Sequence, residues 1–408
     1  MNETTVSVTY ARIQPVRGRL CNFALMLSGA LALCATMEAM PALAQDQTLK
    51  VGAQGVFSGE LSSYGDRQRG GIAFALSKAG DLSIGGKKVT VQVVYADDQG
   101  SGEKGPIAAQ QLIDDHVSAV IGPAFTGATA AAMPLFQQAS IPAISPWTSG
   151  NNLPALGGGY YFRVSYRSDC QGEALANIAA GMGAKSVVVV DDNEAYGSDI
   201  SAAVGRNLPG LGIKVAGSYH GSAGITDWSP VLQRIKQDAP DLVIYDGYFA
   251  EAGRLFQQAR ERGIAVPFLG SDGVGDPGIL KVADAAKLTN VSAISTVPPQ
   301  LIEGTESPEW LAFKKEYPAF AKSQGLSVID PDIYVALAFD ATNILLDAVK
   351  RANAVDSAAI VAALRTTDIQ GLTGAFKYDA KGERQGCETS YSVFDNGAFK
   401  PAKAPAKQ

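Results

Sequence analysis

The stretch AVIGPAFTGATAAAMPLFQQASIPAISPWTS, from Ala119 to Ser149, decides the fold class of this 408-residue chain. A short apolar run at 119–121 ends in a glycine-proline turn, and an alanine-rich segment of helical composition begins at Thr126. A second apolar run, 141–145, stops at the polar residues 146–149. The pattern predicts strand, loop, helix, strand and loop, which is typical of an α/β protein with parallel strands.

Two polar loops of this stretch follow the carboxyl ends of parallel strands, the edge at which open α/β sheets bind ligands. Thr126 occupies the predicted N-cap position of the helix, beside backbone N–H groups that have no partner within the helix. Such a helix end attracts an anion, most simply a carboxylate.

The first 44 residues have the pattern of a secretory signal peptide. Three arginines precede an apolar stretch from about Cys21 to Met37, and Ala42-Leu43-Ala44 offers a small-residue cleavage site ahead of Gln45. No later stretch reaches the ~20 apolar residues of a membrane-spanning helix. We therefore expect export to the periplasm and cleavage near Ala44/Gln45.

The charge balance argues against nucleic acid as a partner. Removing the three arginines and two glutamates of the leader from 34 basic and 40 acidic residues leaves 31 against 38, a net charge of −7. Basic runs are missing from the sequence as well, so we expect no nucleic-acid binding.

Cys170 and Cys387 are the two cysteines that remain after the leader. An oxidising compartment allows them to form a disulfide, but two distant cysteines can equally be buried free thiols. The sequence leaves both alternatives open.

The β-α alternation continues on both sides of the first stretch. Residues 186–190 form a continuous β-branched apolar run, typical of a parallel strand buried on both faces. Two successive stacks of β-α units predict two doubly wound domains. The predicted strands are 49–53, 89–95, 119–121, 141–145, 160–164, 186–190, 214–219, 242–245, 266–270 and 291–296. The predicted helices after the leader include 65–79, 107–113, 172–182, 229–237, 250–262 and 278–286.

The last hundred residues break this alternation. Apolar spacing predicts three helices and two short strands, and Asp395-Asn396-Gly397 predicts a tight turn after the second strand. We expect Lys400 to Gln408 to fray. The predicted elements are helices 310–317, 332–349 and 357–364 and strands 375–378 and 390–394.

Enzyme motifs are missing from the sequence. His116 and His220 are the only histidines, and neither has a metal-ligand partner four residues on. A nucleophile elbow, a C-x-x-C pair and a phosphate-binding loop do not occur. Residues 273–278 match G-x-G-x-x-G formally, but Asp272 and Asp276 would repel a pyrophosphate and Pro277 has no N–H to donate. We expect no cofactor and no metal.

Polar and aromatic residues gather instead at predicted strand ends in both halves. Hydroxyls and N–H groups in the first half suit a carboxylate, and one carboxylate with two tyrosines in the second half suits an ammonium. Taken singly, each residue has a plainer interpretation: a packed tyrosine, a plug at the domain junction, or a helix cap. Their joint placement predicts a zwitterion held between two lobes by Tyr64, Thr126, Trp147, Ser149, Tyr196, Tyr248 and Asp272.

From Leu49 to Phe399 the chain resembles a periplasmic substrate-binding protein of the leucine/isoleucine/valine type, the receptor of a branched-chain amino-acid ABC transporter. Ordered motifs carry the resemblance: Ser63-Tyr64-Gly65-Asp66, Ile121-Gly122-Pro123, Ile144-Ser145-Pro146, Ala195-Tyr196-Gly197, Tyr245-Asp246-Gly247-Tyr248 and Gly270-Ser271-Asp272-Gly273-Val274.

The resemblance implies the type I periplasmic-binding-protein fold, with two Rossmann-like lobes joined by three crossovers. It places residues 45–166 and 297–375 in the first lobe, 167–296 and 376–400 in the second, and 401–408 in a tail.

The resemblance also implies roles for the site residues. Thr126 and Ser149 match hydroxyls that hold the ligand carboxylate, with backbone groups of Trp147 helping. Three features depart from the family's pattern. Asp272 stands where leucine-type receptors carry a longer glutamate for the ammonium, and Trp147 replaces a small residue. The loop Phe125-Thr126-Gly127 stands where those receptors have a loop rich in cysteine and serine. Tyr196 and Tyr248 match tyrosines that close over the ligand, and Tyr64 matches a residue of the side-chain pocket.

The sequence thus predicts a monomeric periplasmic receptor without enzymatic activity. It would deliver a small amino-acid-like ligand, with a branched-chain amino acid as the first expectation, to the permease of an ABC transporter. A periplasmic sensor of the same fold for amides or small aromatic acids is the first alternative. An exported α/β enzyme is the second.

Overall fold

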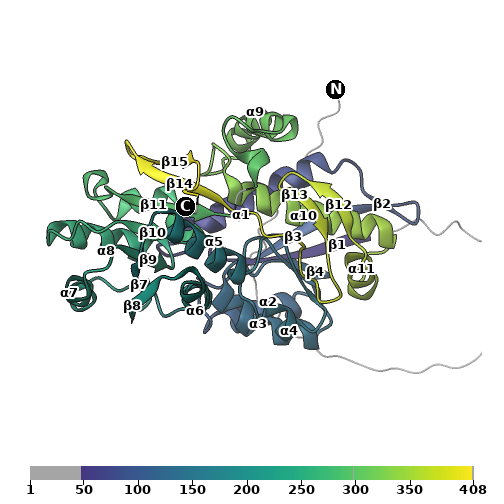
Figure 1. The fold of residues 1–408 in the computed structure, drawn as a ribbon. Coiled ribbons are helices and arrows are strands. Elements are labelled where there is room, and N and C mark those ends of the chain that lie inside the picture. The colour runs from purple at the N-terminus through teal and green to yellow at the C-terminus, as the bar shows by residue number, and fades with distance from the viewer. Residues whose placement is uncertain (1–46, 297, 407–408) are drawn as a thin grey trace, which may run out of the picture. The chain divides into compact units, whose positions relative to one another are not determined.

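The computed structural model describes residues 47–296 and 298–406 (Figure 1). The predicted signal peptide, residues 1–44, and its cleavage site lie outside the described residues. Within the described part, no helix is both long enough and apolar enough to cross a membrane.

Two parallel-stranded sheets confirm the predicted α/β class with two doubly wound lobes. The first has the order β2-β3-β1-β4-β5-β6, and only the two-residue β2 is antiparallel to its neighbour. Its strands are β1 Gln47–Gly55, β2 Ser83–Ile84, β3 Lys87–Asp97, β4 Ala119–Ile121, β5 Ala143–Ser145 and β6 Tyr161–Arg163.

The second sheet has the order β15-β14-β11-β10-β9-β7-β8, with an antiparallel pair at one edge. Its strands are β7 Ser186–Asp191, β8 Lys214–His220, β9 Leu242–Asp246, β10 Phe268–Gly270, β11 Val291–Ser295, β14 Ser390–Asp395 and β15 Ala398–Ala402. A small hairpin of β12, Asp368–Gly371, and β13, Gly374–Lys377, stands apart.

The helices follow the predicted alternation, and the late ones return to the first sheet: α10 packs along α1 and against β4. The side chains of β7 from Val187 onward are buried, as the β-branched run predicted. The helices are α1 Ser62–Lys78, α2 Gly105–Asp114, α3 Thr126–Gln138, α4 Leu153–Gly157, α5 Ser168–Gly181, α6 Ala195–Asn207, α7 Ser229–Asp238, α8 Phe249–Glu261, α9 Pro308–Ser323, α10 Ile333–Ala352 and α11 Ser357–Leu364.

The helix predicted at 278–286 was wrong. The chain forms two short 3-10 turns there, Pro277–Lys281 and Ala285–Lys287. The carboxylates of Asp276 and Asp284 each accept a backbone N–H two residues later and so start a separate turn. The first turn ends at Lys281, and Asp284 then begins a second turn, so no continuous α-helix forms.

The prediction that the chain frays from Lys400 onward was also wrong in part. Asn396 and Gly397 both have positive φ, so the chain reverses in a tight turn and Ala398–Ala402 pairs antiparallel with β14. Figure 1 shows this hairpin, β14 and β15, at the C-terminal end of the colour scale. Backbone pairing with an edge strand needs no apolar side chains, which is why composition did not reveal it.

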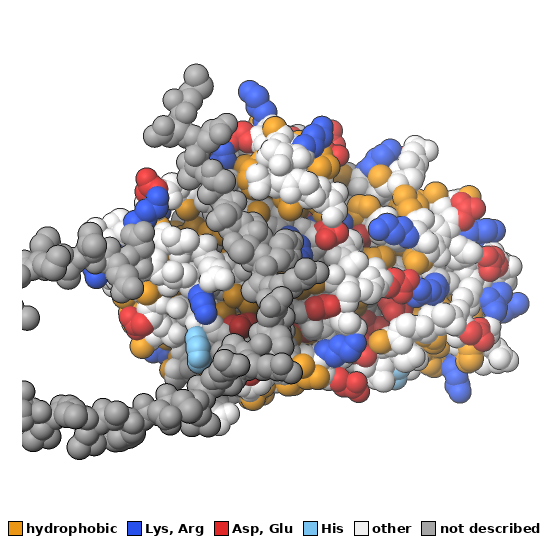
Figure 2. All heavy atoms as spheres, turned by 180° about the vertical axis from the view of Figure 1, so that it is seen from behind, with side chains coloured by type: hydrophobic (Ala, Val, Ile, Leu, Met, Phe, Trp, Pro, Cys, Tyr) orange, Lys and Arg blue, Asp and Glu red, His pale blue; other side chains and the backbone are white. Residues whose placement is uncertain are grey.

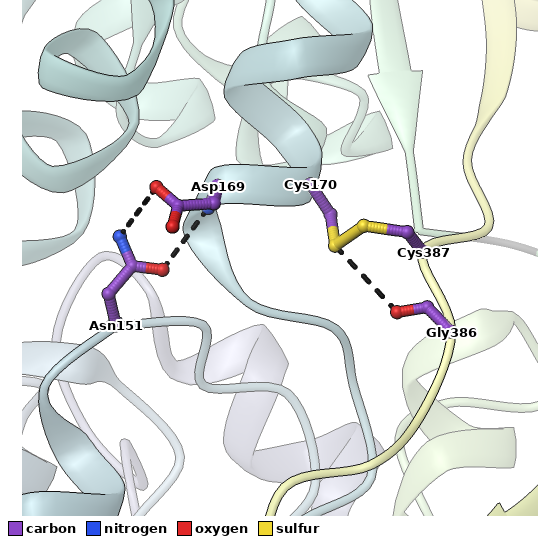
Figure 3. Close-up of a disulfide and its surroundings, with 5 residues drawn as sticks. All are labelled: Asn151, Asp169, Cys170, Gly386 and Cys387. Atoms are coloured by element: carbon purple, nitrogen blue, oxygen red, sulfur yellow. Dashed lines mark hydrogen bonds between the residues drawn. A yellow bond between two sulfur atoms is a disulfide. The ribbon is translucent and has the colours of Figure 1, made fainter.

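A disulfide joins Cys170, on α5, to Cys387, in the segment between β13 and β14 (Figure 3). The two cysteines are 217 residues apart in sequence. Beside this bond, Asn151 exchanges two hydrogen bonds with Asp169, one to its carboxylate and one from its backbone N–H, each at 3.2 Å.

Candidate functional site

A small cavity of about 20 Å³ lies between helix and loop residues of the two lobes. Every predicted site residue except Ser149 lines it. The lining residues are Tyr64, Ala124, Phe125, Thr126, Trp147, Thr148, Tyr196, Tyr248, Asp272, Gly273 and Tyr334. A volume of this size holds about one water molecule, so a larger ligand needs the aromatic side chains or the lobes to move apart.

The first-lobe side of the cavity combines a helix start with two buried polar atoms. Phe125, with an extended backbone, is the N-cap of α3, and Thr126 is the first helical residue; the predicted N-cap role of Thr126 was therefore wrong by one position. The hydroxyl of Thr126 and the indole N–H of Trp147 are buried without a hydrogen-bond partner among the described residues. Because unpartnered buried polar groups are costly, these two atoms are suited to a polar ligand.

The second-lobe side of the cavity centres on the carboxylate of Asp272. Tyr196 donates its hydroxyl proton to one carboxylate oxygen, and Thr296 donates to the other at 3.2 Å. The backbone N–H of Asp272 donates to Gln171 at 3.3 Å. Burial raises the pKa of the Asp272 carboxyl, whereas these hydroxyl donors act to lower it. The tyrosine and threonine orient the carboxylate and stabilise its charged form.

Aromatic rings form most of the wall. The ring of Tyr248 stacks on two neighbours. Its centroid is 4.6 Å from that of Phe125 and 5.0 Å from that of Tyr196. Tyr64 meets Tyr334 edge to face at 4.9 Å. Aromatic faces attract cations and pack well against flat or apolar groups.

Ser149 is buried, but the structure does not place it on the cavity. Its hydroxyl accepts a hydrogen bond from the Ser168 hydroxyl at 3.1 Å, and its carbonyl accepts from the Ser168 N–H at 2.7 Å. The neighbouring Thr148 lines the cavity in its place.

Sequence reasoning missed Phe125, Thr148 and Tyr334 as lining residues. Phe125 and Thr148 are direct neighbours of predicted residues, so the strand-end rule located their loops but did not select these two side chains. Tyr334 begins α10, far along the chain, and its hydroxyl lies 3.4 Å from the carbonyl oxygen of Asp272. No strand-end pattern marks such a residue, because its position follows from how α10 packs on α1.

A second cavity of about 180 Å³ adjoins the first, sharing Phe125, Tyr196 and Tyr248 with it. Asp192, Glu194 and Glu251 bring carboxyl groups to its wall. Burial raises the pKa of Asp192 to about 8, with further increases from the negative charges of Glu251, Asp191 and Glu194.

This raised pKa predicts a pH dependence of stability. Between pH ~4, the usual aspartate pKa, and pH 8, the folded protein keeps a proton on Asp192 that the unfolded chain has released. The free energy of unfolding therefore falls as pH rises through this window. Asp192→Asn should remove this part of the decline, because an amide does not titrate and its oxygen can still accept from the Glu194 N–H. Urea unfolding of both proteins from pH 5 to 9 measures it, and parallel curves would contradict the prediction.

A larger cavity of about 880 Å³ lies elsewhere, lined mainly by α1, α9, α10 and the β12–β13 hairpin. It contains none of the predicted site residues. Its most buried charged residues, Asp340 and Arg384, already bond to backbone groups of the protein. The small cavity, with its unpartnered polar atoms, is therefore the better candidate.

Within residues 47–296 and 298–406, no three His, Cys, Asp or Glu side chains are arranged to hold a metal ion. On the face seen in Figure 2, lysine and arginine side chains lie among aspartates and glutamates over the described surface.

Comparisons with known proteins agree with this architecture. A family described as "Periplasmic binding protein" matches residues 48–396. The leucine-, isoleucine-, valine-, threonine- and alanine-binding protein of Pseudomonas aeruginosa is 27% identical over 342 residues, covering 82% of this chain and 87% of the relative.

Two solved structures have the same fold. The branched-chain amino acid transporter substrate-binding protein of Streptococcus pneumoniae, in complex with isoleucine, has a TM-score of 0.74 and 29% identity, covering 87% of this chain and 99% of that one. A solute-binding protein of R. palustris in complex with benzoate has a TM-score of 0.76 at 20% identity, covering 88% and 97%.

Proposed function

Because the chain belongs to the periplasmic binding protein family, we propose that it is a receptor for a small amino-acid-like ligand, bound between its two lobes. The proposal extends to a branched-chain amino acid as the ligand, to delivery to the permease of an ABC transporter, and to the absence of catalysis. The chain would act as a monomer in the periplasm after cleavage near Ala44/Gln45.

The observation that carries this proposal is the polarity of the cavity. Asp272 offers a negative charge from one lobe, and Thr126, at the N-terminal end of α3, offers an unpartnered hydroxyl from the other. A zwitterion matches both sides at once, with its ammonium toward Asp272 and its carboxylate toward α3. Ligand contacts from two lobes couple binding to closure, since only the closed arrangement makes both sets.

The remaining predicted residues also have proposed roles in ligand binding. Tyr64, Trp147, Tyr196 and Tyr248 would surround the ligand between its two charged ends. Ser149 would contribute to the carboxylate only after giving up its hydrogen bond with Ser168.

A thermal-shift screen tests the function. At 100 times its Kd, a ligand that binds only the folded state adds about 2.7 kcal/mol to the free energy of unfolding, which raises the melting temperature. We expect leucine, isoleucine or valine to give the largest shift, with amides and small aromatic acids as the comparison sets. No shift from any amino acid would contradict the proposal.

The aromatic wall supports the second candidate, a sensor or receptor for amides or small aromatic acids, because flat ligands stack on such rings. A larger shift with benzoate than with leucine would favour it. An exported enzyme, the third candidate, would convert the ligand during prolonged incubation, whereas a receptor returns it unchanged.

A further inference from the structure

Arg67 is a buried cation behind the aromatic wall of the cavity. It lies on α1, and its side chain is 9% exposed. Its guanidinium carbon is 5.5 Å from the ring centroid of Tyr64 and 5.5 Å from that of Tyr334, two rings that line the cavity. Arg67 itself does not line the cavity, so its effect on a ligand passes through these rings.

Two carboxylates contact this guanidinium, one from each lobe. Asp332 is the N-cap of α10, which packs on α1, and it accepts from the Arg67 Nε at 2.5 Å. Asp276 follows β10 of the second sheet and caps the turn that packs against α8. Its oxygen is 3.1 Å from Arg67 Nη1, and its side chain is 0% exposed.

The two ion pairs therefore respond differently to a separation of the lobes. The pair with Asp332 joins elements that pack together in one lobe, so it would survive opening. The pair with Asp276 joins the two lobes, so it would break on opening. In the closed arrangement the Asp276 carboxylate is fully buried beside Arg67, so a variant that removes one of the two charges leaves the other less compensated in that arrangement.

A second ion pair across the lobes supplies a natural comparison. Arg254 of α8 contacts Glu60, which precedes α1, but the side chains are 20% and 45% exposed. Exposed ion pairs contribute little because water and salt screen them.

We propose that Arg67 is a positioning residue that couples lobe closure to the shape of the ligand cavity, with Asp276 as its partner across the lobes. Closing brings Asp276 to a guanidinium that Asp332 already holds, and the guanidinium then fixes the Tyr64 and Tyr334 rings against the cavity. The closed arrangement is thereby populated before ligand arrives. The link between this closure and ligand binding rests on the proposed receptor function, whereas the ion pair across the lobes does not.

The distance between the lobes tests the proposal without a ligand. Spin labels on cysteines introduced at the exposed residues Lys88 and Lys236 report this distance by double electron–electron resonance, and the native cysteines are engaged in the disulfide. We expect a short and a long distance in the otherwise unmutated protein. Asp276→Asn should lower the ratio of closed to open molecules about tenfold, on the scale of a weakened buried ion pair.

Asp332→Asn and Glu60→Gln are the matched controls. Asparagine preserves the cap at both aspartates, so each Asp→Asn change removes one charge and keeps the local turn. We expect Asp332→Asn to lower the melting temperature and Glu60→Gln to change little, each with a distance ratio within about twofold of the parent. Arg67→Lys keeps the charge but cannot span both carboxylates, and should open the lobes as Asp276→Asn does.

A single long distance in the parent protein, or an unchanged ratio in Asp276→Asn, would overturn the proposal. An equal fall in the ratio of closed to open molecules in Asp332→Asn would also overturn the proposal, because it would indicate a general loss of stability. Failure of the thermal-shift screen would instead reject the receptor function and leave these distances unaffected.

Discussion

Asp272→Ala is expected to weaken ligand binding about 5- to 150-fold, which corresponds to roughly 1–3 kcal/mol for a lost charged hydrogen bond. Tyr196 and Thr296 hold the carboxylate toward the cavity, so removing it also takes an acceptor from both hydroxyls, although that of Tyr196 keeps the Gln171 side-chain oxygen at 3.3 Å. Isothermal titration calorimetry with the amino acid that gives the largest thermal shift measures the effect.

Two further variants make this result specific. Thr126→Val removes the unpartnered hydroxyl on the opposite side and keeps its shape, and it should also weaken binding by a measurable factor. Asp81→Ala removes a carboxylate from an exposed ion pair, where the side chain is 86% exposed, and should leave the affinity unchanged. Unaltered affinity in both Asp272→Ala and Thr126→Val would reject the site.

Removing the disulfide is expected to lower the free energy of unfolding by about 2–5 kcal/mol. The bond closes a long loop, since Cys170 and Cys387 are 217 residues apart, and so restricts the unfolded chain strongly. The double variant Cys170→Ala/Cys387→Ala should unfold at lower urea concentration than the oxidised parent.

A thiol count provides the control for this prediction. The unfolded, exported protein should contain no free thiol without reductant and two with it, and the reduced parent should unfold near the double variant. Two free thiols in the oxidised sample would show that the bond does not form, and equal urea midpoints would show that it does not stabilise the fold.

Local chemistry explains why much of the candidate site could be predicted. Tyr196, Tyr248 and Asp272 follow strands of one parallel sheet, so strand direction alone brings them to one edge. Thr126 follows β4 and begins α3 for the same reason. These residues line one cavity because both sheets present their carboxyl edges to it.

Other features depended on contacts between distant segments. Ser149 has the residue type and the loop that the pattern requires, yet its hydroxyl turns to Ser168. Tyr334 and Arg67 reach the cavity region through the packing of α10 on α1, more than 250 residues apart in sequence. The periodicity of the sequence does not show which hydrogen-bond partner a polar side chain has, because that partner depends on which residues are its neighbours in the folded structure.

The sequence by itself determined the α/β class, the two doubly wound lobes and the edge at which the candidate site lies. Apolar periodicity and turn residues act over a few positions, so they can be read directly from the chain. The tertiary structure alone decided that 277–287 forms two capped turns, that 398–402 pairs as a strand, and that Cys170 meets Cys387. It also decided that aromatic rings form most of the cavity wall, because packing and pairing energies depend on segments that only folding brings together.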